Sequence, residues 1–214
     1  MLYVKTFENE AEKASYAGPK KYVSFTKENS KSAMKTPDYS QEYLTFKILT
    51  DGTIAYHLEE EEGLALIPVS YSLDNGETWS DPSDSISINV QPGDIILWKG
   101  EYEYTESEIQ YAYFFGESTA ALNIEGNIMS LLYGDNFIGQ TSLKNIPYVF
   151  TGIFEYTNII NAKNLVLPAV SLTEYCYCVM FDSCTLLKSS PKLPATVLAE
   201  ACYMSMFGGC ASLL

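Results

Sequence analysis

The chain has 214 residues, of which 47% are hydrophobic and 19% are charged, a balance typical of a folded globular protein rather than a disordered one. Its formal net charge of −14 and its lack of arginine argue against a nucleic-acid partner, because binding to phosphates needs clustered Lys and Arg. No run approaches the roughly 18 consecutive apolar residues that a membrane-spanning helix needs, so we expect no membrane insertion.

Residues 1–40 are polar and weakly patterned, and we interpret them as an N-terminal arm or anchor. The sequence suggests a short helix around residues 9–16 and a strand over 22–26. A flexible terminus is the alternative, since terminal residues are ordered only where something holds them. The first ten residues lack the apolar core and the small-residue cleavage site of a signal peptide, so we do not expect export by the secretion route.

Apolar and polar residues alternate through much of 41–115. Asp-Gly, Asn-Gly and Pro-Gly pairs separate the alternating runs, and short runs divided by such turns predict antiparallel hairpins. This many short strands predicts an immunoglobulin-like β-sandwich. The apolar positions of the runs are Leu44, Phe46 and Ile48; Ile54, Tyr56 and Leu58; Ile67, Val69, Tyr71 and Leu73; Ile86, Ile88 and Val90; and Ile109, Tyr111, Tyr113 and Phe115.

Residues 72–79 read Ser-Leu-Asp-Asn-Gly-Glu-Thr-Trp and resemble the Asp-box that recurs in sialidase propellers. The resemblance implies a structural hairpin turn, in which Asp74 caps the turn and Trp79 packs beneath it. Sialidases repeat the box on several blades and grip their substrate with arginines, whereas this chain has one box and no arginine. We therefore interpret Asn75-Gly76 as a hairpin turn and Trp79 as a core residue.

Two charged features of the same region are expected to face solvent. His57, the only histidine, lies in the phase opposite to its apolar neighbours, and no nucleophile motif accompanies it. Residues 59–62 are four glutamates that lack the spaced ligands and the turn glycine of an EF-hand loop. We interpret them as a solvated loop.

A repeat of 26 residues fills the C-terminal third of the chain, where residues 167–187 superpose on 193–213. A weaker copy precedes them at an offset of 27. Periods of about 20–29 residues with recurring Leu are typical of leucine-rich solenoids. We therefore predict a leucine-rich-repeat solenoid over 148–214, with a strand and a short helix in each repeat, and a junction over 116–147 that caps its start. The fold class is thus mainly β with α elements: an arm, a sandwich and a solenoid.

Four of the five cysteines follow the repeat, which favours a core role over metal binding. Cys176 and Cys202 share one repeat position, and Cys184 and Cys210 share another. Zinc needs four convergent ligands, and the spacing of Cys176 and Cys178 fits neither a zinc knuckle nor a redox pair. We expect no metal and no cofactor.

The sequence ends on Ala211-Ser212-Leu213-Leu214, without the polar cap that a solenoid needs. We expect this end either to continue into further repeats or to be covered by a partner subunit.

The run Leu-Pro-Ala-x-x-Leu-x-x-x-Cys-Tyr-x-x-Met-Phe-x-x-Cys-x-x-Leu, at residues 167–187 and again from 193, resembles the BspA-like leucine-rich repeats of bacterial surface proteins. Residues 125–137 and the sandwich around Asn75-Gly76 resemble a module that often precedes such repeats in proteins of gut bacteria and their phages. The resemblance implies an adhesin or a virion appendage protein that binds host surfaces or glycans.

These observations together predict a non-enzymatic structural or recognition protein. The missing signal peptide favours a phage virion protein, a fibre or decoration, that assembles with other virion proteins or with copies of itself as an oligomer. The alternative is a secreted bacterial cell-surface adhesin that binds host protein or glycan. A glycan-processing enzyme is a remote alternative, because catalytic carboxylate pairs cannot be identified by spacing alone.

Ligand residues of a repeat protein should be exposed positions that differ between repeats. Tyr156 aligns with Ser183, and Tyr175 aligns with Ala201. Tyrosines of this kind can stack on sugars or anchor a protein partner. Tyr156 and Tyr175 are therefore the candidate ligand-binding residues.

Overall fold

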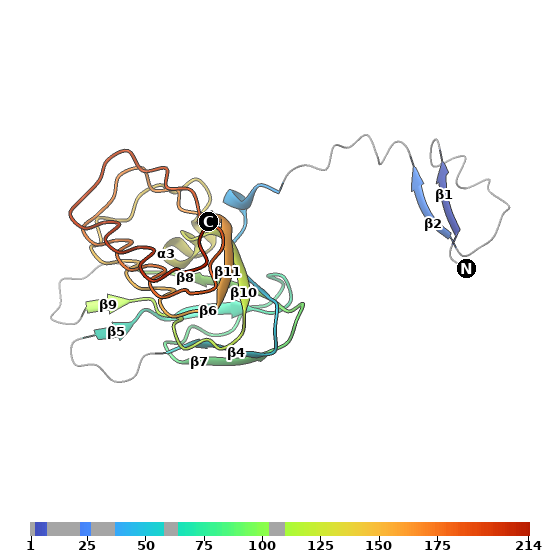
Figure 1. Cartoon of the computed structure of the whole chain (residues 1–214), viewed down its shortest axis with the longest axis horizontal. Helices are drawn as coiled ribbons and strands as arrows, with labels where there is room; N and C mark the ends of the chain where they lie inside the picture. Colours follow the sequence, from blue (N-terminus) through green and yellow to red (C-terminus); the bar gives the residue numbers. More distant parts are fainter. Residues whose placement is uncertain (1–2, 8–21, 27–36, 58–63, 103–109) are drawn as a thin grey trace. The chain divides into compact units, whose positions relative to one another are not determined.

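The computed structural model describes two compact units, Met1–Asp38 and Tyr39–Leu214 (Figure 1). In the first unit, β1 (Tyr3–Phe7) and β2 (Tyr22–Thr26) pair in parallel. The strand expected over 22–26 is confirmed, whereas the helix expected around residues 9–16 lies outside the described residues. The described residues are 3–7, 22–26, 37–57, 64–102 and 110–214.

The second unit is built on a five-stranded sheet with the order β11-β10-β3-β8-β6. Neighbouring strands run antiparallel, except for β10 and β11, which run parallel. The strands of this sheet are β3 (Leu44–Ile48), β6 (Val69–Ser72), β8 (Ile95–Gly100), β10 (Leu122–Asn127) and β11 (Ile159–Val166).

The second unit also contains two strand pairs and three short helical turns. The antiparallel pair joins β4 (Gly52–Tyr56) and β7 (Ile86–Val90), and the parallel pair joins β5 (Leu64–Leu66) and β9 (Gln110–Ala112). The helical turns are η1 (Tyr39–Gln41), α3 (Ser130–Tyr133) and η2 (Gly134–Asn136). Within the described ranges, no helix has the length and apolar character needed to cross a membrane.

β3 lies at the centre of the sheet and buries the apolar residues of its alternating pattern. Leu44, Phe46 and Ile48 are all buried. Phe46 lies opposite Ile96 of β8 and Ile124 of β10, so apolar side chains meet across all three strands. The strands expected at 44–48 and 86–90 are confirmed as β3 and β7.

Residues 148–156, 175–183 and 201–209 form three turn segments in place of the expected helices. In each segment the first, fifth and ninth residues have a φ between 46° and 65°. A right-handed helix needs an unbroken run of negative φ, so a left-handed residue at every fourth position prevents one. These residues are Tyr148, Gly152 and Tyr156; Tyr175, Val179 and Ser183; and Ala201, Ser205 and Gly209.

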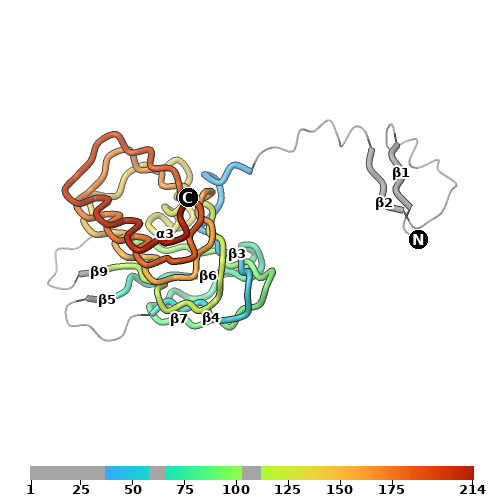
Figure 2. Tube along the Cα trace, in the orientation of Figure 1, coloured from blue at the N-terminus to red at the C-terminus, as the bar shows by residue number. Residues whose placement is uncertain are grey.

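The turn segments run side by side, and Figure 2 shows the successive coils of this part of the chain in orange to red. Side chains that the repeat aligns in the sequence stack on one another, which adds about 0.5–1.5 kcal/mol per aromatic pair beyond the burial of apolar surface. The ring centroids are 6.0 Å apart for Phe150–Tyr177, 5.8 Å for Tyr177–Tyr203, 5.4 Å for Phe154–Phe181 and 5.6 Å for Phe181–Phe207.

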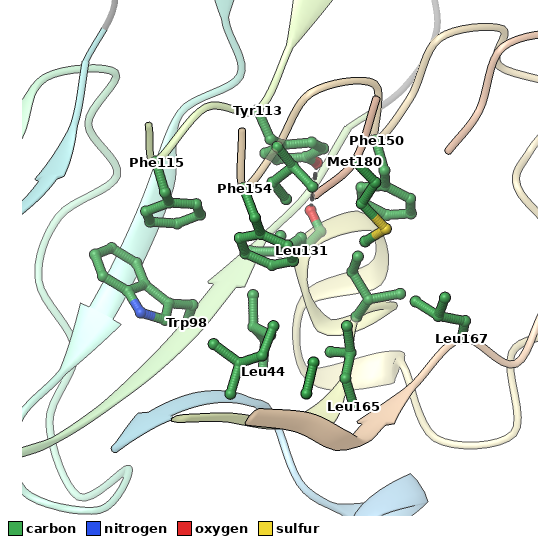
Figure 3. Packing of buried hydrophobic residues seen from close by; sticks show 14 of the residues in the cluster. Leu44, Trp98, Tyr113, Phe115, Leu131, Phe150, Phe154, Leu165, Leu167 and Met180 are labelled. Carbon is green, nitrogen blue, oxygen red and sulfur yellow. Dashed lines mark hydrogen bonds between the residues drawn. The ribbon is translucent and has the colours of Figure 1, made fainter. Parts of the chain in front are cut away.

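Both aromatic stacks continue into the core beside the sheet (Figure 3). The ring of Tyr113 stacks on Phe150 at 5.5 Å, and that of Phe115 stacks on Phe154 at 6.1 Å. The hydroxyl of Tyr113 donates a 2.6 Å hydrogen bond to the carbonyl of Leu131, which ties α3 to the same core. One core therefore joins the sheet and the turn segments.

The predicted fold class is therefore wrong. The described residues are mostly β, with α3 as their single α-helix, and they contain no leucine-rich solenoid with a strand and a helix in each repeat. The left-handed residues of the turn segments are the physical reason. The described part of 41–115 also forms no immunoglobulin-like sandwich, because β10 and β11 lie beyond residue 115 and extend the same sheet, with a parallel pair.

Candidate functional site

A surface pocket of about 240 Å³ lies where the ends of β6 and β8 meet η2. Its lining includes the charged residues Lys99, Glu101 and Asp135 together with two prolines. Pockets that bind small molecules combine apolar surface with a few placed polar groups in this way. The lining residues are Pro68, Ser70, Pro82, Lys99, Gly100, Glu101, Gly134 and Asp135.

Two glycines allow the walls of this pocket to approach one another. A Cβ atom at Gly100 would lie 2.7 Å from the carbonyl oxygen of Leu131, so β8 lies directly against α3. A Cβ atom at Gly134 would lie 2.6 Å from Oε1 of Glu101. Gly134 also has a φ of +54°, which other residues adopt only at a cost.

A cluster of four residues, Tyr43, Trp79, Lys99 and Asp135, forms one side of the site and is called here the Lys99 cluster. Nζ of Lys99 donates hydrogen bonds to both carboxylate oxygens of Asp135, at 2.9 and 3.0 Å. The same Nζ lies 4.3 Å from the ring centroid of Trp79, within the range of a cation–π contact. Tyr43 donates its hydroxyl to Oδ1 of Asp135 at 2.8 Å, and its ring lies 4.9 Å from that of Trp79.

These contacts fix the protonation state of the cluster at neutral pH. Burial, and then the hydrogen bond to Asp135, raise the pKa of Tyr43 to about 12, so it stays a hydrogen-bond donor. Hydrogen bonds from Lys99, and then from Tyr43, lower the pKa of Asp135, which keeps it ionised. The Asp135 side chain remains 62% exposed, so it can accept further hydrogen bonds from a ligand.

The Asp-box holds Trp79 next to the cluster. Oδ1 of Asp74 accepts the backbone N–H of Thr78 at 2.9 Å and the hydroxyl of Ser72 at 2.8 Å, while Oδ2 accepts the hydroxyl of Thr78 at 2.6 Å. Asn75 has a φ of 61° and Gly76 has a φ of 90°, as a tight turn requires. The expected turn and its Asp74 cap are confirmed. Trp79, however, is half-buried between Tyr43 and Lys99, so its expected place in the buried core is wrong.

Replacement of Asp74 with Asn should lower the melting temperature, because the turn loses the carboxylate that accepts its hydrogen bonds. Those bonds, first the one from the Thr78 hydroxyl, lower the pKa of Asp74 from 3.8 to about 2. A carboxylate whose pKa is lower in the folded state than in the unfolded state stabilises the fold at pH values above its unfolded pKa. This contribution disappears as the pH falls through the folded pKa. The advantage of the native chain over Asp74→Asn should therefore shrink between about pH 4 and pH 2 in melting curves. Asp51→Asn, at an exposed aspartate outside the box, is the control, and a loss as large in that variant would contradict the prediction.

A second hollow of about 460 Å³ lies beside the first one and shares Glu101 with it. Nζ of Lys144 donates a 2.8 Å hydrogen bond to the carbonyl of Tyr102 and lies 4.7 Å from the ring centroid of Tyr133. The remaining lining residues are Leu132 and Asn136. Glu101 therefore lines both hollows.

The structure places the predicted ligand residues on different turn segments. Tyr156 is 63% exposed at the end of the first segment, where the negative charge of Glu155 raises its pKa. Tyr175 begins the second segment, and its ring stacks on that of Tyr148 at 4.8 Å and 11°. Tyr175 is thus paired with Tyr148, a residue that the offset of 27 aligns with it but that we did not predict as a site residue.

The cysteines lie where the repeat predicts. Cys176, Cys184 and Cys202 are buried, and all five cysteines are free. Burial raises the pKa of the Cys176 and Cys184 thiols to about 11, which leaves them protonated and unreactive at neutral pH. In the described ranges, no group of three or more His, Cys, Asp or Glu side chains converges as a metal site would require.

The expected solvent-facing His57 is partly exposed, and its Nε2 lies 2.6 Å from Oε2 of Glu117. No local pattern indicates that partner, which lies 60 residues further along the chain. The four glutamates at 59–62, expected to form a solvated loop, lie outside the described residues.

Sequence reasoning missed the pocket altogether. Lys99 and Asp135 lie 36 residues apart, and no motif links them. A lysine near the end of a strand and an aspartate in a short turn are ordinary surface residues until the sheet and η2 bring them together. Comparisons with protein families, with curated proteins and with solved structures give no significant match to this chain.

Proposed function

We propose that the protein is a non-enzymatic recognition protein that binds a hydroxyl-rich group, such as a sugar of a surface glycan, in the pocket beside the Lys99 cluster. The observation that carries this proposal is the lining of the pocket, where Lys99, Glu101 and Asp135 converge beside two proline rings. An amino group can donate to hydroxyls, and carboxylates can accept from them. The proline rings offer apolar surface to the C–H face of a sugar.

The Lys99 cluster is preorganised for this task. Lys99 is held by Asp135 and by the ring of Trp79, and Asp135 is held in turn by Tyr43. A ligand that binds groups already fixed in place avoids much of the entropy cost of ordering them. A volume of about 240 Å³ suits one sugar ring of a longer chain rather than a whole oligosaccharide.

The same binding role fits either biological setting that the sequence favours. In a phage virion appendage the site would serve attachment to a host surface, and in a bacterial adhesin it would serve attachment to host tissue. The genes that flank the coding sequence test the setting directly. Capsid, portal or tail genes support the virion, and an upstream signal peptide in the natural reading frame supports the adhesin.

Binding of the full chain to an array of glycans tests the proposed role. We expect Asp135→Asn and Lys99→Met to weaken binding to the best glycan by about 10-fold each, or about 1.4 kcal/mol, because each removes a charge-assisted hydrogen bond. Binding is measured by calorimetry with the purified glycan, and circular dichroism checks that both variants remain folded.

The matched control is the double variant Tyr156→Ala and Tyr175→Ala, which alters the turn segments and leaves the pocket lining intact. It should bind as the native chain does. Loss of binding in this double variant with full binding in Asp135→Asn would transfer the site to the tyrosines and overturn the pocket proposal. Release of free sugar from the bound glycan would show an enzyme and contradict the non-enzymatic role.

A further inference from the structure

Three charged residues line the pocket, and their charges do not cancel. Lys99 contributes one positive charge, while Glu101 and Asp135 contribute two negative ones, which leaves a formal charge of −1 in the lining. The formal net charge of the whole chain is −14. A ligand therefore meets a negative pocket on a negative protein.

Within the pocket, the charges of Lys99 and Asp135 compensate one another. Nζ of Lys99 donates hydrogen bonds to both carboxylate oxygens of Asp135, which use two of its three N–H donors. The ring centroid of Trp79 lies 4.3 Å from the same Nζ, and the Lys99 side chain is only 21% exposed. Lys99 is thus already engaged and has one donor left for a ligand.

Glu101 carries the charge that is not compensated. Its side chain lies against Gly134, where an added Cβ atom would be 2.6 Å from Oε1 and 2.9 Å from Cγ of Glu101. Glu101 is exposed, and no ion pair or hydrogen bond joins its side chain to another described residue. Its backbone pairs with Tyr133 in an antiparallel bridge, which fixes where the side chain begins. The pocket therefore holds one unpaired carboxylate on a fixed backbone.

The second hollow indicates from which side a cation can reach Glu101. That hollow is also lined by Lys144, whose Nζ donates to the carbonyl of Tyr102 and lies 4.7 Å from the ring centroid of Tyr133. A ligand cation there would face a like charge, which is unfavourable. In the first pocket the cation of the lining is Lys99, whose charge is already offset. A cation is therefore favoured on the side of the first pocket.

The geometry favours an amine over a metal ion as this cation. Among the described residues, no group of three or more His, Cys, Asp or Glu side chains could hold a metal. An ammonium group needs fewer acceptors, and both Glu101 and Oδ2 of Asp135 can accept its N–H groups. Pro68 and Pro82 line the same pocket and offer apolar surface to a carbon ring that bears the amine.

We propose that the pocket selects an amino sugar, a glycan unit with a free protonated amine, and that Glu101 is the residue that selects it. The ammonium group binds Glu101 on the side of Gly134 and Asp135. The same charge disfavours acidic sugars such as uronic acids, since their carboxylates would face Glu101. The amine selection rests on the proposed glycan binding and names the class of sugar.

A series of trisaccharides with one β-1,4-linked ring skeleton tests the selection. Glucosamine, N-acetylglucosamine and glucose trimers carry an amine, an acetamide and a hydroxyl at the same carbon, and a glucuronic acid trimer adds carboxylates. Calorimetry uses the full chain at about pH 5.5, where an amine is protonated. We expect the glucosamine trimer to bind at least about 10-fold more tightly than the glucose trimer, and the glucuronic acid trimer to bind most weakly. The 10-fold preference should shrink as salt is added, because salt screens exposed charges.

Glu101→Gln removes the charge and keeps the size of the side chain. The ratio of glucosamine-trimer to glucose-trimer affinity should fall to about 1 in this variant. Glu174→Gln is the matched control, because Glu174 is exposed on a turn segment and outside the pocket lining. It changes the net charge equally and should keep the native ratio. Circular dichroism checks that both variants are folded.

A native ratio that persists in Glu101→Gln, or falls equally in Glu174→Gln, would overturn the selection by Glu101. Failure of the native chain to prefer the glucosamine trimer would overturn it too. If array glycans still bind and Asp135→Asn weakens them, the glycan-binding role survives without amine selection, whereas absence of any glycan binding removes both. Tighter binding of an end-blocked Gly-Lys-Gly peptide than of the glucosamine trimer would assign the pocket to protein lysines and also overturn the proposal.

Discussion

Replacement of Phe181 with alanine is expected to lower the free energy of unfolding by about 3–5 kcal/mol, the usual cost of removing a fully buried phenylalanine. Phe181 is 0% exposed and lies between two rings, with centroids 5.4 Å away at Phe154 and 5.6 Å away at Phe207. The variant would leave a cavity inside the stack that joins the turn segments to the core. Denaturation in urea, followed by circular dichroism, measures the loss.

Phe207 provides the matched control, because it is the last ring described in the same stack. It is half-buried, and Phe181 is its ring neighbour in the stack. Phe207→Ala should cost about 1–2 kcal/mol, since a half-buried side chain loses less burial. Similar losses in the two variants would show that stacking within the turn segments does not stabilise the unit, contrary to the structure.

Replacement of Gly126 with alanine is expected to cost more than about 4 kcal/mol or to prevent folding, which places it among the exceptional substitutions. A Cβ atom there would lie 1.9 Å from the carbonyl oxygen of Tyr43, a backbone atom that cannot move aside without displacing its segment. Gly126 also has a φ of +84°. The N–H of the adjacent Asn127 donates to the carbonyl of Glu42 at 2.8 Å, so β10 and the segment that carries Tyr43 are joined at this point.

Gly139 separates the two causes of that loss. It has a φ of +78°, and a Cβ atom added there would have no heavy atom within 4 Å, so Gly139→Ala tests backbone strain without a clash. We expect a loss of about 1–3 kcal/mol for Gly139→Ala. Chemical denaturation of both variants provides the comparison, and equal losses would show that the contact with Tyr43 is not limiting. If Gly126→Ala yields folded protein, its glycan binding should also fall, because Tyr43 holds Asp135.

The elements that sequence analysis recovered depend on local patterns. Alternation predicted β3 and β7 because the apolar residues of each lie on one face of a regular strand. It missed β8, whose residues Ile96, Leu97 and Trp98 are consecutive and buried, so no alternation marks the strand. A strand that is buried on both faces has a continuous apolar run in its sequence. Such a run does not distinguish a strand from other buried elements.

The error over helices has a different origin. A spacing of 26 residues shows that segments are equivalent, but it carries no information on the φ of each residue. Tyr148, Val179 and Ser205 adopt left-handed conformations that single residue types rarely reveal, since only glycine favours them by itself. Hydrogen bonds to the neighbouring segment hold Tyr148 and Val179 in place, and such bonds become visible only in three dimensions.

Local sequence was enough to establish the turn at Asn75-Gly76 with its Asp74 cap, the strands β3 and β7, the core role of the periodic cysteines and the alignment of side chains that stack between turn segments. All of these follow from the chemistry of a few residues or from a repeated spacing. The order of the sheet, the parallel pairing of β10 with β11, and the pocket at Lys99 and Asp135 emerged only from the folded chain. Each of those depends on contacts between residues far apart in the sequence, whose partners are chosen by the packing of the whole unit.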